Sequence, residues 1–493
     1  MRFHLRLLSV CAGLLLSAGW AIAAPATPIG VEGAKHLLNR TAFGATPAEI
    51  HQYAKLDRTE AVDHLLQEAD AAPPPSVPEG LADYLPPSRL RAAEGDDKKQ
   101  LIRQIISQGL DLKSWWLNQM LIADTPGAQF RERMTLFWHN HFTSSLEKVK
   151  EPALLLRQNQ LLRQEALGNF GRLLHAVGKD PAMVVYLDSA TNRRGQPNEN
   201  FAREVMELFT LGEGNYTEAD IHEAARAYTG WSIDPETGDY KWRPFAHDGG
   251  SKTVLGQTGN FNGDDILDIL LSRPETARFV MTKLWRSFVS PEPDAKQIEK
   301  LARTFRDSRY DIRAAMRALL LSPAFWAPEN HAVLIKSPVD LVVGSLRTLS
   351  FHVPDPYPFI FSLRQQGEDI FSPPNVKGWP GGDAWINTNS LLARKQFLDR
   401  LLRDDGGGGG NRQMMGQMMA GGKKLGMEGR TRLASAMSSI RFDASAWNDA
   451  LSQSGLTAEQ ALLALPPADT VSPEMADRAV LRALVLDPAY QVK

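Results

Sequence analysis

Apolar residues recur at intervals of three and four along most of this chain, which is the spacing of helices with one buried face. In "DIRAAMRALLLS", for example, Ile312, Met316, Leu319 and Leu320 lie on one stripe. Similar patterns cover residues 101–124, 128–141, 151–178, 198–211, 218–229, 275–289 and 386–403. Strand-like alternation is scarce. The sequence therefore predicts a mostly α, multi-helix globular domain with a small β-hairpin or irregular excursion near 240–261.

The first 23 residues have the three parts of a secretory signal peptide. Two arginines precede an apolar run that ends at Trp20, and small residues at 21–23 form a cleavage site. The apolar run is too short to span a bilayer comfortably, although a retained anchor is the alternative. We predict cleavage after Ala23 and an exported protein that is periplasmic, cell-surface or secreted, with no stable membrane span.

Cleavage at that point would remove Cys11, the only cysteine, so the mature chain would fold without disulfides. The full sequence has 55 basic and 57 acidic residues and a formal net charge of −2. This balance gives no electrostatic footprint for nucleic acid, which we therefore exclude as a partner.

Two low-complexity stretches divide the chain. Residues 72–88 are too rich in proline for a helix interior and predict an exposed loop. Residues 404–428 contain five successive glycines and five methionines, which predicts a flexible linker. We expect a helical family domain over 24–403, the linker over 404–428, and a small C-terminal helical segment over 429–493. That segment could also supply the last helices of the main domain.

The stretch "RMTLFWHNHFTSS" (133–145) places two histidines beside aromatic residues. Two imidazoles this close suit metal binding or proton transfer. On one continuous helix, however, His139 and His141 are about 200° apart and cannot chelate one ion. They would converge only if the helix ended near Asn140. The alternative is a core-lining His141 and a surface His139.

A second candidate lies on the predicted helix over 198–211, where Asn200, Arg203, Glu204 and Glu207 share a polar stripe. Two carboxylates could bind a divalent ion or act as acid and base, with Arg203 holding one of them ionised. The alternative is a solvated face with an exposed Arg203–Glu207 pair, which contributes little stability.

Two loops offer further candidates. In "RPFAHDGGSKTVLG", His247 and Asp248 could bind a metal or orient a proton, or the segment could be a tight turn. In "SPPNVKGWPGGDAWINTN", Trp379 and Trp385 could form a stacking platform for a sugar ring or peptide. The same two indoles could instead fill the core.

Several common catalytic motifs are absent from the sequence. It contains no G-x-S-x-G elbow, no H-E-x-x-H, no Walker loop and no C-x-x-C-H haem motif. The familiar hydrolase, zinc-protease, nucleotide and cytochrome mechanisms therefore have no support from motifs.

At these segments the chain resembles a bacterial family catalogued as "domain of unknown function 1800". The matching stretches include "HLLNRTAFGATPAEI", "RMTLFWHNHFTSS", "NENFAREVMELFTLG", "YTEADIHEAARAYTGW", "FAHDGGSKTVLG", "VMTKLWRSFV", "KSPVDLVVGSLRTL" and "PPNVKGWPGGDAWIN", and they extend over 36–397. The resemblance implies an exported, largely helical protein, and it brings no established activity. It also implies a co-exported sulfatase- or phosphatase-like protein as a partner, because such a family is often encoded beside this one.

The family's signature positions fall on polar residues that a helical core does not require, which suggests one shared site. We expect the metal ligands to be His139, His141, His247 and Asp248, with zinc or manganese as the ion. We expect the catalytic residues to be Glu204, Glu207 and Arg203. We expect the substrate-binding residues to be Asn198, Asn200, Lys252, Asn375, Trp379 and Trp385.

Two functions follow from these expectations. The first is a metal-dependent hydrolase at the periplasm or cell surface, in which a carboxylate acts as general base on metal-bound water. The second is a non-catalytic binding or assembly protein for surface polymers or an exported partner, in which the tryptophan loop is the contact surface.

Overall fold

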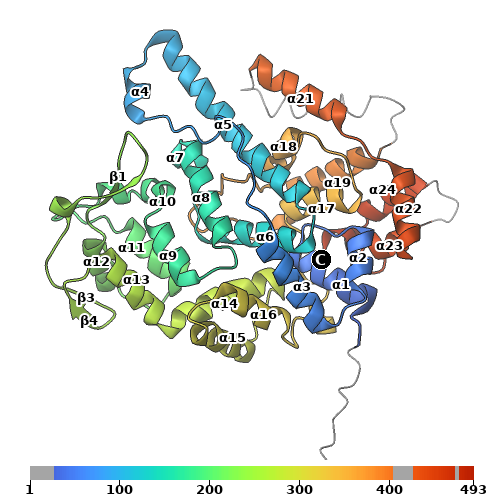
Figure 1. Ribbon diagram of the computed structural model, residues 1–493, viewed down its shortest axis with the longest axis horizontal. Coiled ribbons are helices and arrows are strands. Elements are labelled where there is room, and N and C mark those ends of the chain that lie inside the picture. Colours follow the sequence, from blue (N-terminus) through green and yellow to red (C-terminus); the bar gives the residue numbers. More distant parts are fainter. Residues whose placement is uncertain (1–26, 404–425, 472–476) are drawn as a thin grey trace, which may run out of the picture.

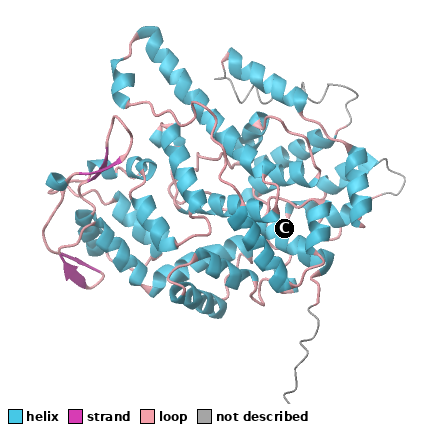
Figure 2. Ribbon diagram, viewed as in Figure 1, coloured by secondary structure: helices cyan, strands magenta, loops and turns pink. Residues whose placement is uncertain are grey.

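The computed structural model describes residues 27–403, 426–471 and 477–493. The predicted signal peptide, Cys11 and most of the predicted linker lie outside the described residues. Within the described part the fold is mostly α-helical, which confirms the predicted fold class, and the strands form two small antiparallel pairs (Figure 2). No helix in the described part is long and apolar enough to cross a membrane.

From residue 27 to residue 188, the secondary-structure elements that the structure describes are all helices (Figure 1). They are α1 (Gly30–Thr41), α2 (Pro47–Tyr53), α3 (Arg58–Ala71), α4 (Pro87–Ala92), α5 (Gly95–Ile122), α6 (Pro126–His141), α7 (Leu146–Val149), α8 (Pro152–Gln164), α9 (Phe170–Gly178) and α10 (Pro181–Tyr186). Several begin at a polar cap. At α2, for example, Thr46 accepts from the Glu49 amide while the Glu49 carboxylate accepts from the Thr46 amide.

The middle third contains the strands and a second group of helices. Its elements are η1 (Ser189–Thr191), α11 (Asn200–Glu204), η2 (Val205–Thr210), α12 (Glu218–Ala227), β1 (Trp231–Ile233), β2 (Tyr240–Trp242), η3 (Pro244–Ala246), β3 (Lys252–Val254), β4 (Gln257–Gly259), α13 (Gly263–Ser272), α14 (Pro274–Phe288), α15 (Ala295–Asp307), α16 (Ile312–Leu320) and η4 (Pro328–Asn330). The pair β3–β4 falls within the predicted hairpin region, and β1 extends the strand region back to Trp231.

The C-terminal third returns to the N-terminal helices (Figure 1). Its elements are α17 (Pro338–Thr348), α18 (Tyr357–Gln366), η5 (Gly382–Trp385), α19 (Thr388–Leu402), α21 (Met427–Ser439), α22 (Ala444–Ser454), α23 (Ala458–Leu462), α24 (Asp477–Leu486) and η6 (Pro488–Gln491). Side chains of this region, including Trp447, Leu481 and Leu484, belong to the same apolar core as the N-terminal helices.

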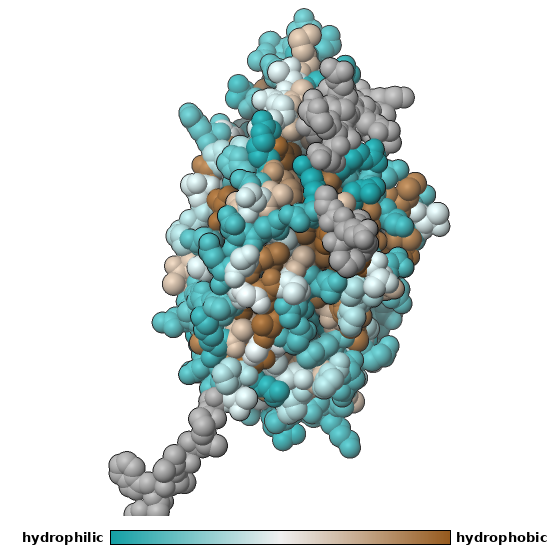
Figure 3. Space-filling view, turned by 90° about the vertical axis from the view of Figure 1, so that its right-hand side faces the viewer, coloured by the Kyte–Doolittle hydropathy of each residue, from teal (hydrophilic) through white to brown (hydrophobic). Residues whose placement is uncertain are grey.

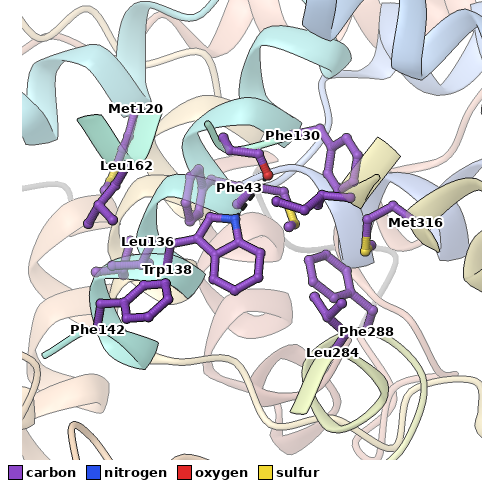
Figure 4. Close-up of a cluster of buried hydrophobic side chains, with 14 of the residues drawn as sticks. Phe43, Met120, Phe130, Leu136, Trp138, Phe142, Leu162, Leu284, Phe288 and Met316 are labelled. Carbon is purple, nitrogen blue, oxygen red and sulfur yellow. Dashed lines mark hydrogen bonds between the residues drawn. The ribbon is translucent and has the colours of Figure 1, made fainter. Parts of the chain in front are cut away.

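Helix α6 lies in the apolar core, where it packs against α1, α3 and α8. The rings of Phe130 and Phe137 on α6 also lie near Phe288 of α14. Figure 4 shows the indole of Trp138 among Phe43, Leu136 and Phe142. Its Nε1 donates a hydrogen bond to the Ala166 carbonyl at 2.9 Å, so the one polar atom of this buried ring is satisfied. Most of the face shown in Figure 3 is hydrophilic, with smaller apolar areas between the polar side chains. The helix that carries both candidate histidines is therefore anchored deep in the molecule.

Candidate functional site

His141 lies at the end of α6, which runs through this residue without a break at Asn140. The condition for the two histidines to converge is therefore not met, and their side chains leave the helix on different sides. The His141 Nε2 atom lies 3.1 Å from the Phe209 carbonyl oxygen. Its Nδ1 atom lies 3.3 Å from the Lys283 ammonium, which also donates to the Leu208 carbonyl at 3.1 Å.

These two carbonyls belong to η2, a π-helical turn that continues α11 where the sequence predicted a regular helix over 198–211. The last carbonyls of a helix have no donor within it, and His141 and Lys283 supply the missing donors. Burial, together with the nearby Lys283 ammonium, lowers the pKa of His141 well below its usual value, so the imidazole is neutral. Burial also lowers the pKa of Lys283 to about 8. The local role of His141 is to complete this helix end.

His139 is enclosed by aromatic rings instead. The centroids of Phe371, Trp116 and Trp379 lie 5.0, 5.2 and 5.9 Å from its own. Neither ring nitrogen has a hydrogen-bond partner among the described residues. Burial lowers its pKa to about 3, so this histidine is also neutral. The alternative prediction placed His139 at the surface. This prediction is wrong, because the side chain is buried.

Asn140, between the two histidines, connects α6 to the predicted tryptophan loop. Its Oδ1 accepts from the Trp379 amide at 2.7 Å, and its Nδ2 donates to the Trp379 carbonyl at 3.3 Å. Gly378 has a φ of +80°, and a Cβ on it would lie 2.1 Å from the Asn140 Oδ1. Only glycine fits this close approach, so two of the family-like segments meet here by direct contact.

Glu204 and Glu207 lie close together on the α11–η2 segment, as predicted. The Tyr216 hydroxyl donates to Glu207 at 2.7 Å, and the Lys377 ammonium lies 3.7 Å from the same carboxylate. Burial and the neighbouring Glu207 raise the pKa of Glu204. Lys377 belongs to the loop that carries Trp379, so this loop contacts the carboxylate pair as well as α6.

Arg203 does not take part in an ion pair with either of these carboxylates. Its guanidinium lies 2.7 Å from Glu218 and 3.4 Å from Glu199, on a partly exposed side of the helix. The prediction that Arg203 pairs with Glu204 or Glu207 is wrong, because a more distant acidic residue at the start of α12 is better placed.

His247, Asp248 and Lys252 form a closed turn. Asp248 pairs with Arg226 at 2.8 Å, and this hydrogen bond lowers the pKa of Asp248 to about 2. The Lys252 ammonium is buried and donates to two loop carbonyls at 2.6 and 2.9 Å. The His247 Nδ1 lies 3.0 Å from the Thr229 carbonyl. The polar side chains of the "HDGGSK" segment therefore stabilise the turn through these partners.

Two of the three asparagines predicted to bind substrate, Asn198 and Asn375, hold turns of the backbone. The Asn198 Oδ1 accepts from the Asn200 amide at 3.0 Å, and the Asn375 Oδ1 accepts from the Lys377 amide at 2.8 Å. Such contacts are typical of turns formed by asparagine. Asn200 also donates to Asp188 at 3.4 Å.

Of the four residues expected to hold a metal, His141, His247 and Asp248 have separate partners, and His139 is enclosed by aromatic rings. Over 27–403, 426–471 and 477–493, no group of three or more His, Cys, Asp or Glu side chains is arranged to hold a metal ion. One predicted ligand, His141, already uses both ring nitrogens, and another, Asp248, is paired with Arg226. The expected zinc- or manganese-like ion does not fit this arrangement, and we assign no chemical step to it.

A cleft of about 360 Å³ opens beside Asn140 and Trp379. Its walls come from α6, α14, the start of α17, the segment 379–385 and Lys493, and we call it the Trp379 cleft. This volume lies within the range of about 300–1,000 Å³ that is usual for ligand pockets. Trp379 and Trp385 are only 4% and 7% exposed, so they contribute part of the wall and do not form an open platform.

The cleft also contains charged residues that the sequence did not single out. Asp340 accepts from Arg133, from Lys493 at 2.6 Å and from the Ser337 amide at 2.9 Å. "KSPVDL" does indicate a helix cap at Ser337 and Asp340. Nothing in the sequence indicates that Arg133, more than 200 residues earlier, approaches that cap, because the contact depends on how α6 and α17 pack.

Comparison with known proteins agrees with the resemblance seen in the sequence. A family model described as "Protein of unknown function (DUF1800)" matches residues 36–492. The chain belongs to this family. Searches of curated proteins and of solved structures gave no significant match. Membership of DUF1800 thus covers almost all described residues, including the helices after the predicted linker, and assigns no activity to them.

Proposed function

We propose that this DUF1800 protein is a non-catalytic binding protein for an exported polymer, which it holds in the Trp379 cleft. The observation that carries this proposal is the cleft itself. It is of ligand size, and its wall includes Trp379, Trp385 and Phe137 together with the polar groups of Asn140 and Arg133. The Asn140–Trp379 contact fixes the loop on one side, so the binding surface is formed in advance.

The N-terminal sequence supports a site of action outside the cytoplasm. Its charged start, its apolar run and its small-residue cleavage pattern are those of a secretory signal peptide. A polymer at the periplasm or cell surface is therefore the ligand that this protein would encounter.

Binding can be tested with the full exported chain and a panel of surface oligosaccharides and peptides, followed by tryptophan fluorescence. The variant Trp385→Ala should weaken binding, because it removes part of the cleft wall. Trp242→Ala is the matched control, since Trp242 is exposed on β2 and does not line the cleft. Equal affinities for the two variants and the parent protein would contradict the proposal.

A hydrolytic function is the second candidate, and the unequal surroundings of two neighbouring carboxylates favour it. Burial and Glu207 raise the pKa of Glu204, whereas Glu207 is held by Tyr216 and lies near Lys377. Carboxylates in unequal environments are typical of acid and base pairs. Release of new reducing ends from a bound oligosaccharide tests this candidate. Glu204→Gln should abolish the release, whereas the control Glu299→Gln on α15 should retain it.

A further inference from the structure

The charges around the Trp379 cleft are unbalanced. Arg133, Arg286 and Lys493 line it, together with the carboxylates of Asp340 and Glu368. Asp340 is already neutralised, because Arg133 and Lys493 both donate to it. Glu368 accepts from the Val339 amide at 2.8 Å, and burial raises its pKa to about 7. Arg133 and Lys493 are thus paired with Asp340, and Arg286 is the cation of the cleft wall that has no ion-pair partner among the described residues.

Three more cations lie behind this wall, and main-chain carbonyls satisfy two of them instead of carboxylates. Arg40 donates to the Val289 carbonyl at 2.8 Å and to the Asn330 carbonyl at 2.6 Å. Arg394 donates to the Lys336 carbonyl at 2.8 Å. The third cation is the Lys336 ammonium, which lies 3.7 Å from the centre of the Tyr490 ring.

The charged groups of the cleft wall and of the layer behind it can be counted together. The cations are Arg40, Arg133, Arg286, Lys336, Arg394 and Lys493, and the carboxylates are Asp340 and Glu368. Four guanidinium groups and two carboxylates give a formal excess of +2, which a terminal carboxylate on Lys493 would reduce by one. Lys336 and Lys493 add to this excess only in part at neutral pH, because burial lowers the pKa of each to about 7. Buried charge without a partner is unfavourable, so this excess favours a bound anion.

Arg286 is placed to make first contact with such an anion. It is exposed at the end of α14, lines the cleft and has no ion-pair partner within the described ranges. The Nε of Arg133 is buried and also has no hydrogen-bond partner there. Guanidinium groups bind carboxylate and sulfate-like oxygens through parallel hydrogen bonds.

We propose that the Trp379 cleft binds the anionic group of an acidic carbohydrate, with Arg286 and the Arg133–Lys493 wall as the cationic contacts. This inference rests on the proposed function and narrows its polymer to a polyanion. A carbohydrate fits better than an acidic peptide because the partly exposed ring of Phe137 lines the cleft beside the largely buried Trp379 and Trp385, and it offers aromatic surface for the apolar face of a sugar ring.

The experiment compares a uronic-acid oligosaccharide with its methyl ester, which has the same rings and linkages but no charge. The full chain is titrated with each by calorimetry at low salt. We expect the acid to bind at least about tenfold more tightly than the ester, as a charge-assisted hydrogen bond allows. Arg286→Gln should remove this preference. Arg303→Gln, an exposed arginine on α15 that does not line the cleft, should keep it.

The outcomes separate this inference from the function on which it rests. Equal binding of acid and ester overturns the anion preference and leaves polymer binding in the cleft supported. If neither the acid nor the ester binds, and Trp385→Ala changes the affinity for no ligand of the panel, both the anion preference and polymer binding in the cleft are overturned. Tight binding of poly-glutamate that depends on Arg286 and exceeds that of the acidic sugar overturns the choice of carbohydrate. Thermal melts of Arg286→Gln and Arg303→Gln check that both variants remain folded.

Discussion

The side-chain amide of Asn140 and the main chain of Trp379 hydrogen-bond each other in both directions. The amide oxygen accepts from the Trp379 N–H at 2.7 Å, and the amide nitrogen donates to the Trp379 carbonyl at 3.3 Å. One residue of α6 thereby fixes the loop that forms one wall of the cleft and also covers His139.

Replacing Asn140 should therefore loosen the cleft loop. Asn140→Ala leaves the buried Trp379 amide without its acceptor, which costs about 1–3 kcal/mol of unfolding free energy. Asn140→Asp keeps an acceptor oxygen and should lose less. Urea unfolding followed by tryptophan fluorescence measures both effects. Asn448→Ala, which removes an exposed contact with Asp477, is the control and should differ from the parent by less than about 0.5 kcal/mol. Similar losses for Asn140→Ala and Asn448→Ala would contradict this prediction.

Substitutions at two glycines of the same loop distinguish the cost of backbone strain from the cost of a steric clash. Gly378 and Gly381 both have positive φ, at +80° and +72°. A Cβ on Gly378 would lie 2.1 Å from Asn140, whereas a Cβ on Gly381 meets nothing within 4 Å. Gly381→Ala should cost about 1–3 kcal/mol from backbone strain alone, because its ψ of −173° lies in a region essentially restricted to glycine, and Gly378→Ala should cost more. Thermal and urea unfolding provide the comparison, and equal costs would show that the Asn140 contact is unimportant.

The buried carboxylate of Asp340 should be far more important for stability than an exposed one. Although burial opposes it, Arg133 and Lys493 hold the pKa of Asp340 well below its usual value. Asp340→Asn leaves two buried cations without a partner and should cost about 3–5 kcal/mol. Asp63→Asn removes an exposed pair with Arg317 and should cost less than about 1 kcal/mol. Chemical unfolding at pH 7 measures both, and comparable losses would refute the role assigned to Asp340.

The neutral His139 should make the protein sensitive to acid. The unfolded chain takes up a proton near pH 6.5, whereas the folded imidazole takes it up only near pH 3. The free energy of unfolding should therefore fall as pH is lowered through this window, by at most about 1.4 kcal/mol per pH unit from this residue. His139→Phe should reduce the slope by that amount. The exposed His352→Phe is the control and should retain the parent slope. An unchanged slope in His139→Phe would show that other groups cause the acid sensitivity.

The regular part of the fold could be predicted because periodicity reports directly on burial. The spacing around Met316 predicted α16, and the turn-rich stretch predicted the β3–β4 pair. The π-helical turn at 205–210 could not be predicted, since its residues have the same apolar spacing as an α-helix. Whether a π-helical turn forms here depends on which main-chain carbonyls accept hydrogen bonds from side chains of α6 and α14.

The candidate site was predictable in part for the same reason. Local sequence located the loop with Trp379 and the carboxylates Glu204 and Glu207, which lie close together as expected. It gave no information on the partners of Arg203, because Glu218 follows in the next helix. It also gave no sign of the cations that line the cleft, Arg133, Arg286 and Lys493, which come from three segments that are distant in sequence. Charged contacts between elements follow from packing, and packing has no signature in a single stretch of sequence.

The hydrogen bond from the Leu211 amide to the Met206 carbonyl spans five residues, one more than in an α-helix. A chain one residue shorter in this segment could close an ordinary α-helical turn, which would change the direction of the carbonyls in the turn. The carbonyls that contact His141 and Lys283 would then point elsewhere. Single-residue deletions between 205 and 210 should therefore be tolerated in evolution only together with changes at His141 and Lys283. The length of this segment and the identity of these two side chains should then vary together.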